Sequence, residues 1–215
     1  MLFRQSTLFL LIASALGAFA ALGGNVAFTA VPAGLTTAGF GGGYWFQEVD
    51  ASSATITSTQ LQNAASNGYK TVKANASKVK TTAYPSGVKT PPVVVALYIP
   101  GKGVIVATSI KVGAAIQSTQ TCTTVLWQHR NYANCAEPNA IAIAVQQGWL
   151  TSAAGSAMPA GSMIAIYGKP GKTEGFQSPC ADGTEKGDGC QKLLATYPHL
   201  TLVNPATKRA MEFVV

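Results

Sequence analysis

Features of three common protein classes are absent from this sequence. After residue 20 no apolar run is long enough to cross a bilayer, so we expect no transmembrane segment in the mature chain. No G-x-S-x-G motif is present, and the elbow that carries the nucleophile of many serine hydrolases therefore has no counterpart. No internal repeat is present either. These absences direct attention to the four cysteines.

Charged residues are scarce, and acidic residues are scarcer than basic ones. Charged side chains make up 11% of the sequence, with 15 Lys and Arg against 8 Asp and Glu. Removal of Arg4 with a signal peptide would leave 14 basic residues and 8 acidic ones, a net charge of +6. The basic residues are scattered except for one cluster, which either forms a solvated helix face or contacts phosphate groups. That cluster consists of Lys70, Lys73, Lys78 and Lys80.

The N-terminus has the pattern of a secretory signal peptide. Arg4 precedes an apolar run from Leu8 to Ala20, and Ala18-Phe19-Ala20 supplies the small-x-small pattern of a cleavage site. We expect cleavage after residue 20 and secretion of the remaining 195 of the 215 residues, a length that suits one domain. The alternative, an N-terminal membrane anchor, is disfavoured because the run is shorter than the ~20 residues of a spanning helix.

Residues 21–57 are rich in glycine, alanine and threonine, and we expect an irregular lead-in there because glycine disfavours a stable helix. Its aromatic cluster, Tyr44-Trp45-Phe46, either packs on the core or forms a platform for a ligand. A helix is predicted from Ser58 to Ser77, with an apolar stripe on one side and a break at Gly68. Asn75-Ala76-Ser77 matches the acceptor pattern for N-glycosylation.

Continuous apolar runs predict the strands of a sheet. Residues 92–99 and 104–110 flank the turn Pro100-Gly101-Lys102-Gly103 and predict a hairpin. Strands without polar alternation suit a sheet that is covered on both faces. We therefore predict an α/β fold with helices on both faces of a sheet. Its further strands are predicted at residues 162–168, at residues 200–203 and, as an edge strand, at residues 211–215.

The motif Cys135-Ala136-Glu137-Pro138 places a thiol and a carboxyl two residues apart at the start of a predicted helix. Proline is tolerated in a first helical turn, where its missing N–H would have no partner. Apolar residues follow at three-and-four spacing, and Gly148 stands where a glycine would end the helix. The positive end of a helix dipole favours a thiolate over a thiol. Cys135 is therefore a candidate metal ligand.

Two further cysteines complete a candidate metal site. Cys180 follows Ser178-Pro179, and Cys190 begins a short predicted helix that runs to Tyr197. Nine polar and glycine-rich residues separate the two cysteines, and this segment can fold back so that both sulfurs meet at the helix start. Three thiolates with one coordination position left open describe a catalytic zinc site. The expected cofactor is Zn²⁺, with Cys135, Cys180 and Cys190 as its ligands.

Together these residues resemble the zinc-dependent nucleobase deaminase superfamily, which includes cytidine deaminases and the deaminase domains of secreted toxins. CAEPNAIAIA, the later proline–cysteine pair and the second cysteine correspond to the signature H-x-E with P-C-x-x-C, in the variant whose ligands are all cysteine. The chain departs from the signature where nine residues instead of two separate its last two cysteines. The resemblance covers about residues 92–203 and includes the order hairpin, helix, strand, helix, strand.

The resemblance implies a fold and a reaction. The fold is a three-layer, deaminase-like α/β domain, taken as residues 58–215, whose mixed sheet begins with a hairpin. The reaction is hydrolytic deamination of a cytosine- or adenine-type base, as a nucleobase, as a nucleoside or within a nucleic acid. Glu137 would be the catalytic proton carrier and would not bind the metal. His129 and Asn131 precede the motif and are the candidate substrate-binding residues.

Four cysteines in a secreted chain also support a different interpretation. In an oxidising compartment an even number of cysteines usually forms disulfides. Among the three possible pairings, Cys122–Cys135 with Cys180–Cys190 is favoured because each bond closes a short loop. The zinc hypothesis uses three cysteines and has no role for Cys122. The alternative function is therefore a non-enzymatic secreted interaction or effector-like protein with the same fold, held by two disulfides.

Overall fold

The computed structural model describes residues 46–50, 55–78, 90, 92–109, 135–181 and 189–204. The predictions for the signal peptide, for most of the lead-in and for an edge strand at residues 211–215 lie outside this part of the chain. The same holds for Lys80, Cys122, His129 and Asn131.

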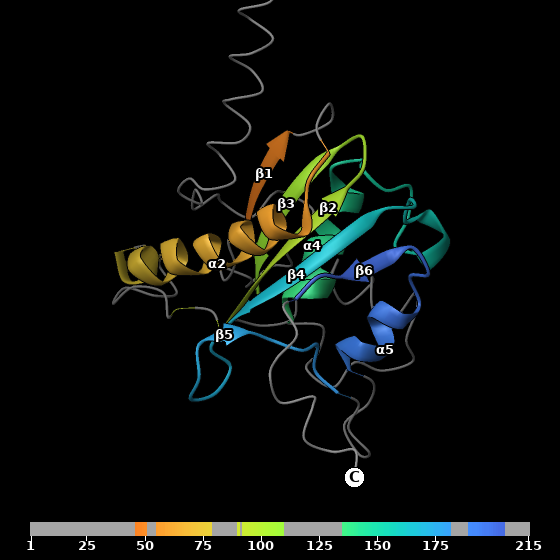
Figure 1. Ribbon diagram of the computed structural model, residues 1–215. Helices are drawn as coiled ribbons and strands as arrows, with labels where there is room; N and C mark the ends of the chain where they lie inside the picture. The colour runs from red at the N-terminus through yellow and green to blue at the C-terminus, as the bar shows by residue number, and fades with distance from the viewer. Residues whose placement is uncertain are drawn as a thin grey trace, which may run out of the picture.

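The described strands form one sheet, shown in Figure 1. Its first four strands lie in the order β1 (Phe46–Asp50), β3 (Gly103–Thr108), β2 (Val93–Ile99) and β4 (Ser162–Gly168). β2 and β3 are the predicted hairpin, and β4 is the predicted third strand. The turn of the hairpin needs a left-handed residue, which Gly101 supplies with φ of 73°.

Two short strands share the outer edge of β4. β5 (Gly175–Phe176) pairs antiparallel with the end of β4, and β6 (Leu200–Leu202) pairs parallel with its beginning. β4 itself is antiparallel to β2 and so runs parallel to β3. The sheet is therefore mixed and contains the hairpin, as predicted, but β1 precedes the hairpin in the chain. β6 confirms the strand predicted at residues 200–203, whereas β5 has only two residues and was not predicted from the sequence.

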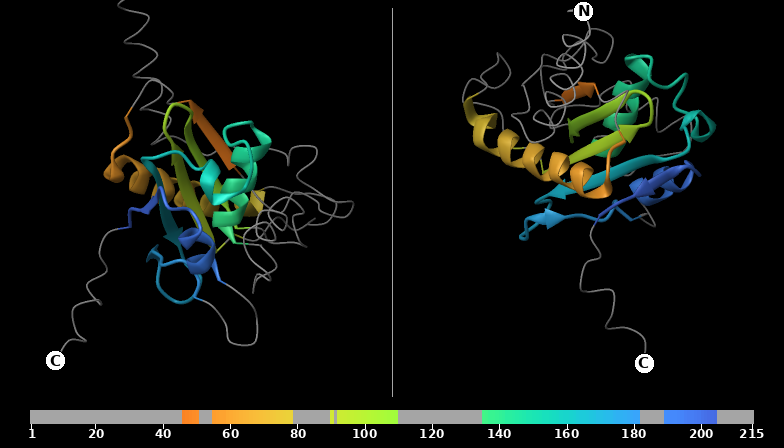
Figure 2. Two further views of the ribbon diagram at one scale, coloured as in Figure 1. Left: turned by 90° about the vertical axis from the view of Figure 1, so that its right-hand side faces the viewer. Right: turned by 45° about the horizontal axis from the view of Figure 1, so that its top comes forward.

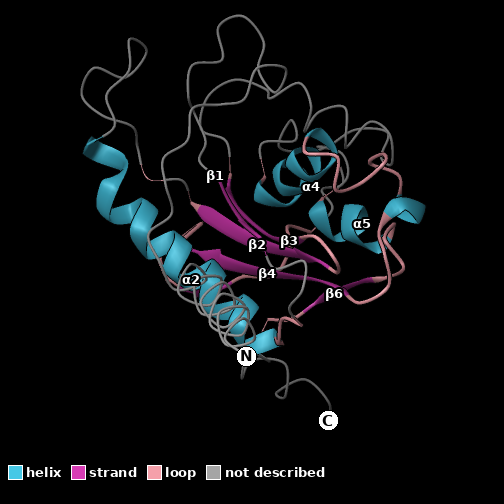
Figure 3. Ribbon diagram, turned by 90° about the horizontal axis from the view of Figure 1, so that it is seen from above, coloured by secondary structure: helices cyan, strands magenta, loops and turns pink. Residues whose placement is uncertain are grey.

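Helices cover both faces of the sheet and complete the three predicted layers (Figures 2 and 3). Helix α2 (Ser58–Asn75) packs on one face, and helices α4 (Ala136–Gln146) and α5 (Cys190–Ala195) pack on the other. Alternate residues of β2 divide between the two cores, because successive side chains of a strand point to opposite faces. Val94 belongs to the core under α2, and Val95 to the core under α4. None of the described helices is long and apolar enough to cross a membrane.

Helix α2 confirms the predicted helix but has no break at Gly68. The helix begins with a capping box, in which the Gln60 N–H donates to the Thr57 hydroxyl at 3.2 Å and the Thr57 N–H donates to the Gln60 side chain at 2.9 Å. Gly68 is buried on the face that packs on the sheet. Glycine costs about 1 kcal/mol relative to alanine inside a helix. Packing of the apolar stripe around Leu61 and Val72 offsets that cost.

Strand β1 corrects the expectation of an irregular lead-in across residues 21–57. It pairs antiparallel with β3 over five residues, from Phe46 opposite Ala107 to Asp50 opposite Gly103. An edge pairing of this kind depends on the backbone of the neighbouring strand more than on local propensity. The glycine-rich sequence that precedes β1 therefore gave no indication of this strand.

Asn204 fills the interval between β5 and β6 along the edge of β4. Its Oδ1 accepts a hydrogen bond from the Ile166 N–H at 2.8 Å, and its Nδ2 donates to the Gln177 carbonyl. The Gln177 N–H in turn donates to the Ile166 carbonyl at 3.0 Å. The Asn204 side chain thus makes a hydrogen bond to the backbone of β4 that the backbone of a neighbouring strand would otherwise make. It also fixes Gln177, which lies three residues before Cys180.

We expect Asn204→Ala to lower the free energy of unfolding by about 1–3 kcal/mol, because it removes the acceptor for the Ile166 N–H in a partly buried setting. Asn204→Asp keeps that acceptor and should lose less stability. Urea titrations of both variants measure the difference. Wild-type stability in Asn204→Ala would contradict this role for the side chain.

Candidate metal centre

The start of α4 carries one thiol and one carboxyl. Cys135 is the N-cap, with φ of −72° and ψ of 158°, and Glu137 and Pro138 are the second and third helical residues. Every residue from Ala136 to Ala144 is buried. Gly148, with φ of 68°, directly follows the C-cap and confirms the predicted end of the helix. The helix start is therefore held inside the protein.

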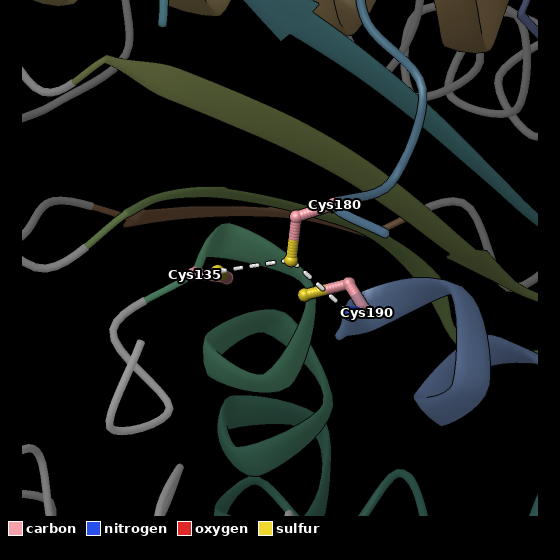
Figure 4. Close-up of side chains that lie close together, drawn as sticks. All are labelled: Cys135, Cys180 and Cys190. Atoms are coloured by element: carbon pink, nitrogen blue, oxygen red, sulfur yellow. Dashed lines mark hydrogen bonds between the residues drawn. The ribbon is translucent and has the colours of Figure 1, made fainter. Parts of the chain in front are cut away.

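Three sulfur atoms converge beside this helix start (Figure 4). The Sγ atoms of Cys135 and Cys180 are 3.9 Å apart, and with Sγ of Cys190 all three lie within 4.8 Å of one another. They come from the N-cap of α4, from the segment after β5 and from the first residue of α5. None of these three cysteines is in a disulfide. The structure thus brings together the thiols that the sequence singled out.

The sulfur spacing suits a tetrahedral zinc ion. Thiolates bound at about 2.3 Å to a tetrahedral zinc are about 3.8 Å apart. The 3.9 Å between Cys135 and Cys180 is close to that separation. Small shifts of Cys190 within the 4.8 Å cluster would bring it to the same separation. The cluster is therefore compatible with a metal such as zinc.

The ionisation of these thiols gives a second reason why a cation fits. The hydrogen bond with Cys180 raises the pKa of Cys135, although the one with Cys190 acts in the opposite direction, and hydrogen bonds with both neighbouring thiols raise the pKa of Cys190. Burial and the Glu137 carboxyl raise both further. Thiolates this close to one another repel, so their joint ionisation requires a compensating positive charge. A divalent cation supplies that charge and deprotonates the thiols that bind it.

The backbone at the start of α5 holds Cys180 in place. The Cys190 N–H donates to Sγ of Cys180 at 3.1 Å, and the Gln191 N–H donates to the Cys180 carbonyl at 3.1 Å. The first N–H groups of a helix have no partner within the helix, so they are available for such bonds. The chain therefore folds back to place Cys180 beside Cys190, as the polar nine-residue spacer was expected to allow.

Gly189 makes this close approach possible. A Cβ atom at this position would lie 2.3 Å from the Cys180 carbonyl oxygen and 2.5 Å from the Ala181 carbonyl oxygen. Both contacts are with backbone, which cannot swing away as a flexible side chain could. Only glycine therefore fits between the two cysteines without a shift of the Cys180 segment.

The Glu137 carboxyl lies beside the sulfurs and is buried, with 4% of the residue exposed. Burial raises its pKa to about 7, while hydrogen bonds from its own backbone N–H and from the Cys190 thiol act in the opposite direction. Its protonated and ionised forms are thus both accessible near neutral pH. The hydrogen bond with Cys190 places this carboxyl next to the cluster of three thiols.

The predicted disulfides are wrong for the described cysteines. Cys135 is not bonded to Cys122, and Cys180 is not bonded to Cys190. The Cys180 sulfur instead accepts a backbone hydrogen bond and lies within 4.8 Å of the other two sulfur atoms. The candidate substrate-binding residues His129 and Asn131 lie outside the described part of the chain, so their role stays a prediction.

Asn139 is a residue of this region that the sequence did not single out. It is buried in α4 and donates from Nδ2 to the Thr108 carbonyl at 2.9 Å. This bond ties the first turns of α4 to the end of β3. Sequence patterns could not reveal this role of Asn139, because its hydrogen-bond partner is a backbone carbonyl 31 residues away in the chain.

Comparisons with known proteins return no match. No family model matches the chain, and no curated protein or solved structure matches it. The function is therefore inferred from the geometry and chemistry of this site.

We expect Gly189→Ala to weaken zinc binding by about 10- to 100-fold, the range seen when groups that orient metal ligands are altered. The new methyl group would displace the Cys180 carbonyl and with it the sulfur. Gly171→Ala is the matched control, because a Cβ atom there meets nothing within 4 Å. Chelator competition measures both affinities, and equal affinities would show that Gly189 does not position the ligands.

Proposed function

We propose that this protein is a secreted zinc-dependent deaminase that hydrolyses the exocyclic amine of a cytosine- or adenine-type base. The observation that supports it best is a buried carboxyl, Glu137, beside three sulfurs whose spacing suits zinc. Structural zinc sites almost always have four protein ligands, whereas catalytic sites have three and leave one position open. The described cluster has three thiols. Secretion is proposed from the N-terminal sequence.

The arrangement of the strands supports the same proposal. β3, β4 and β6 are mutually parallel, so α4 and α5 each connect two parallel strands. Such crossover helices begin at the carboxyl ends of the strands they follow, and here both lie on the same face of the sheet. Open α/β sheets commonly bind ligands at the carboxyl ends of their strands. This is the order hairpin, helix, strand, helix, strand that the deaminase resemblance implies.

The residues of the site can be assigned distinct tasks. Zinc held by Cys135, Cys180 and Cys190 would activate a water molecule for attack on the ring carbon that bears the amine. Glu137 would accept one proton from that water and deliver it to the ring nitrogen. It would then take the second proton from the hydroxyl group added to the ring carbon and pass it to the amine, which leaves as ammonia as the carbonyl forms. Burial of Glu137 protects this carboxyl from exchange with bulk solvent. The Cys190 N–H would orient the Cys180 sulfur as a ligand.

We expect the purified protein to contain one equivalent of zinc and Cys180→Ser to contain far less, because two thiols are too few to hold the ion tightly. Cys122→Ser is the matched control and should keep its zinc. Elemental mass spectrometry, together with a count of reactive thiols, measures both. Folded wild-type protein with two disulfides and no metal would refute the metal site.

We expect Glu137→Gln to retain zinc and to lose about 10²- to 10⁴-fold in deamination rate, since glutamine keeps the shape of the side chain but carries no exchangeable acid proton. Glu48→Gln, at an exposed position in β1, is the control. Ammonia release from cytosine and adenine bases, nucleosides and oligonucleotides measures the rate. Unchanged function in Glu137→Gln would favour the non-enzymatic interaction protein.

A further inference from the structure

Four exposed lysines meet on one surface from two distant parts of the chain. Lys70 and Lys73 lie on α2, one turn apart, and Lys169 and Lys172 lie on the connection between β4 and β5. We call these four residues the lysine surface. Of the six lysines whose side chains the structure describes, the surface holds four, and the other two are Lys102 and Lys192. The sequence showed only the part of this cluster that belongs to α2.

An ion pair and an aromatic row join the two halves of the lysine surface. Nζ of Lys73 lies 2.7 Å from Oε2 of Glu174, which belongs to the β4–β5 connection. Between α2 and the sheet, the rings of Tyr69 and Tyr167 are 5.7 Å apart, and those of Tyr167 and Phe176 are 5.1 Å apart. These contacts fix the connection against α2, so the lysines of both elements belong to one rigid surface.

The lysine surface keeps an excess of positive charge. Glu174 is the acid within it, so its four lysines leave a net charge of +3. The hydrogen bond from Lys73 lowers the pKa of the Glu174 carboxyl, and the charges of Lys169 and Lys70 lower it further. Lys169 and Lys70 therefore lie close to the same carboxyl although they come from different elements. Such a concentration of lysines attracts polyanions.

The lysine surface and the candidate metal centre lie at the same end of the sheet, where β3 and β4 end, but α2 covers one face of the sheet and α4 and α5 cover the other. Four residues of chain lead from Phe176, at the end of β5, to Cys180, and they span no more than about 14 Å even when fully extended. Adjacent phosphates of a single strand can be about 6–7 Å apart when the strand is extended, so a few nucleotides bridge this distance. A strand that is held by the lysines and passes around this end of the sheet, along the segment from β5 to Cys180, can therefore bring one of its bases to the sulfurs.

We propose that the lysine surface binds the phosphate backbone of single-stranded nucleic acid and thereby makes a base within a strand, rather than a free nucleoside, the substrate of the metal centre. The choice of substrate rests on the proposed function, whereas the binding does not. A base must be out of its helical stack before it can be deaminated, which favours a single strand over a duplex.

The composition of the surface favours a nucleic acid over a membrane. Stable membrane binding combines basic residues with exposed apolar side chains that insert into the bilayer. Among the described residues the exposed large hydrophobic side chain is Leu202, which lies in β6 and outside the lysine surface. Phe176 and Tyr167 are instead half-buried in the aromatic row.

The test is fluorescence anisotropy of a labelled single-stranded DNA oligonucleotide, titrated with the full protein at several salt concentrations. Each lost phosphate contact should reduce the slope of log K against log salt by about 0.7. We expect Lys70→Gln/Lys169→Gln to lower the slope by about 1.4 and to weaken binding by roughly 10- to 30-fold at 0.1 M salt. Lys102→Gln, at the exposed turn of the β2–β3 hairpin, is the control and should bind as the wild type does. Thermal unfolding verifies that every variant is folded.

Three results would overturn the proposal. The wild type could fail to bind the oligonucleotide, or the double variant could bind it as tightly as the wild type. Alternatively, vesicles containing phosphatidylserine could bind in a lysine-dependent way while the oligonucleotide does not, which would assign the surface to a membrane.

The outcome is separable from that of the proposed function. If the wild type binds the oligonucleotide through these lysines but deaminates no base, the proposed function fails and the nucleic-acid surface stands. If the wild type deaminates free nucleosides while the double variant binds oligonucleotides normally, the surface fails and the proposed function stands. If both hold, the double variant should also lower the ratio of kcat/KM on an oligonucleotide to that on a nucleoside.

Discussion

The parallel run of β3, β4 and β6 is the constraint on which the rest of the structure depends. Because α4 and α5 each link two of these strands, both helices lie on one face of the sheet and their first turns face each other. The segment after β5 reaches the starts of both helices, where its Cys180 lies 3.9 Å from the Cys135 sulfur and is held by the first N–H groups of α5. The candidate metal centre thus results from the topology of the sheet as much as from its three cysteines.

The surroundings of two of the three thiols and of the Glu137 carboxyl disfavour their ionised forms. A buried carboxyl and crowded thiols cannot ionise together at low energetic cost, and burial raises the pKa of Glu137 to about 7. The surrounding apolar core offsets it, with Ala140, Ile141 and Ile143 of α4 packed against β2 and β3. Buried groups of this kind, held next to a possible ligand position, are typical of sites where stability is given up for chemistry.

Elements whose pattern is local could be predicted from the sequence, whereas features that depend on contacts between distant residues were harder to predict. The strands β2, β3 and β4 and the helix α4 have strong apolar patterns that do not depend on distant contacts, and all were predicted. Gly68 was expected to break α2 because propensity ignores the packing that holds the helix on the sheet. β1 was missed because its partner, β3, lies more than 50 residues away. The disulfide pairing was inferred from loop length, which says nothing about which way a sulfur points.

By itself the sequence determined the chemistry: which thiols and which carboxyl stand at the starts of helices, and which apolar stripes those helices bury. Only the tertiary structure decided that Cys135 and Cys180, 45 residues apart, come within 3.9 Å, and that Lys169 and Lys172 join the lysines of α2. The reason is physical. Local patterns depend on the repeat of a helix or strand, whereas the meeting of distant side chains depends on strand order and on how chain segments cross. No short stretch of sequence contains that information.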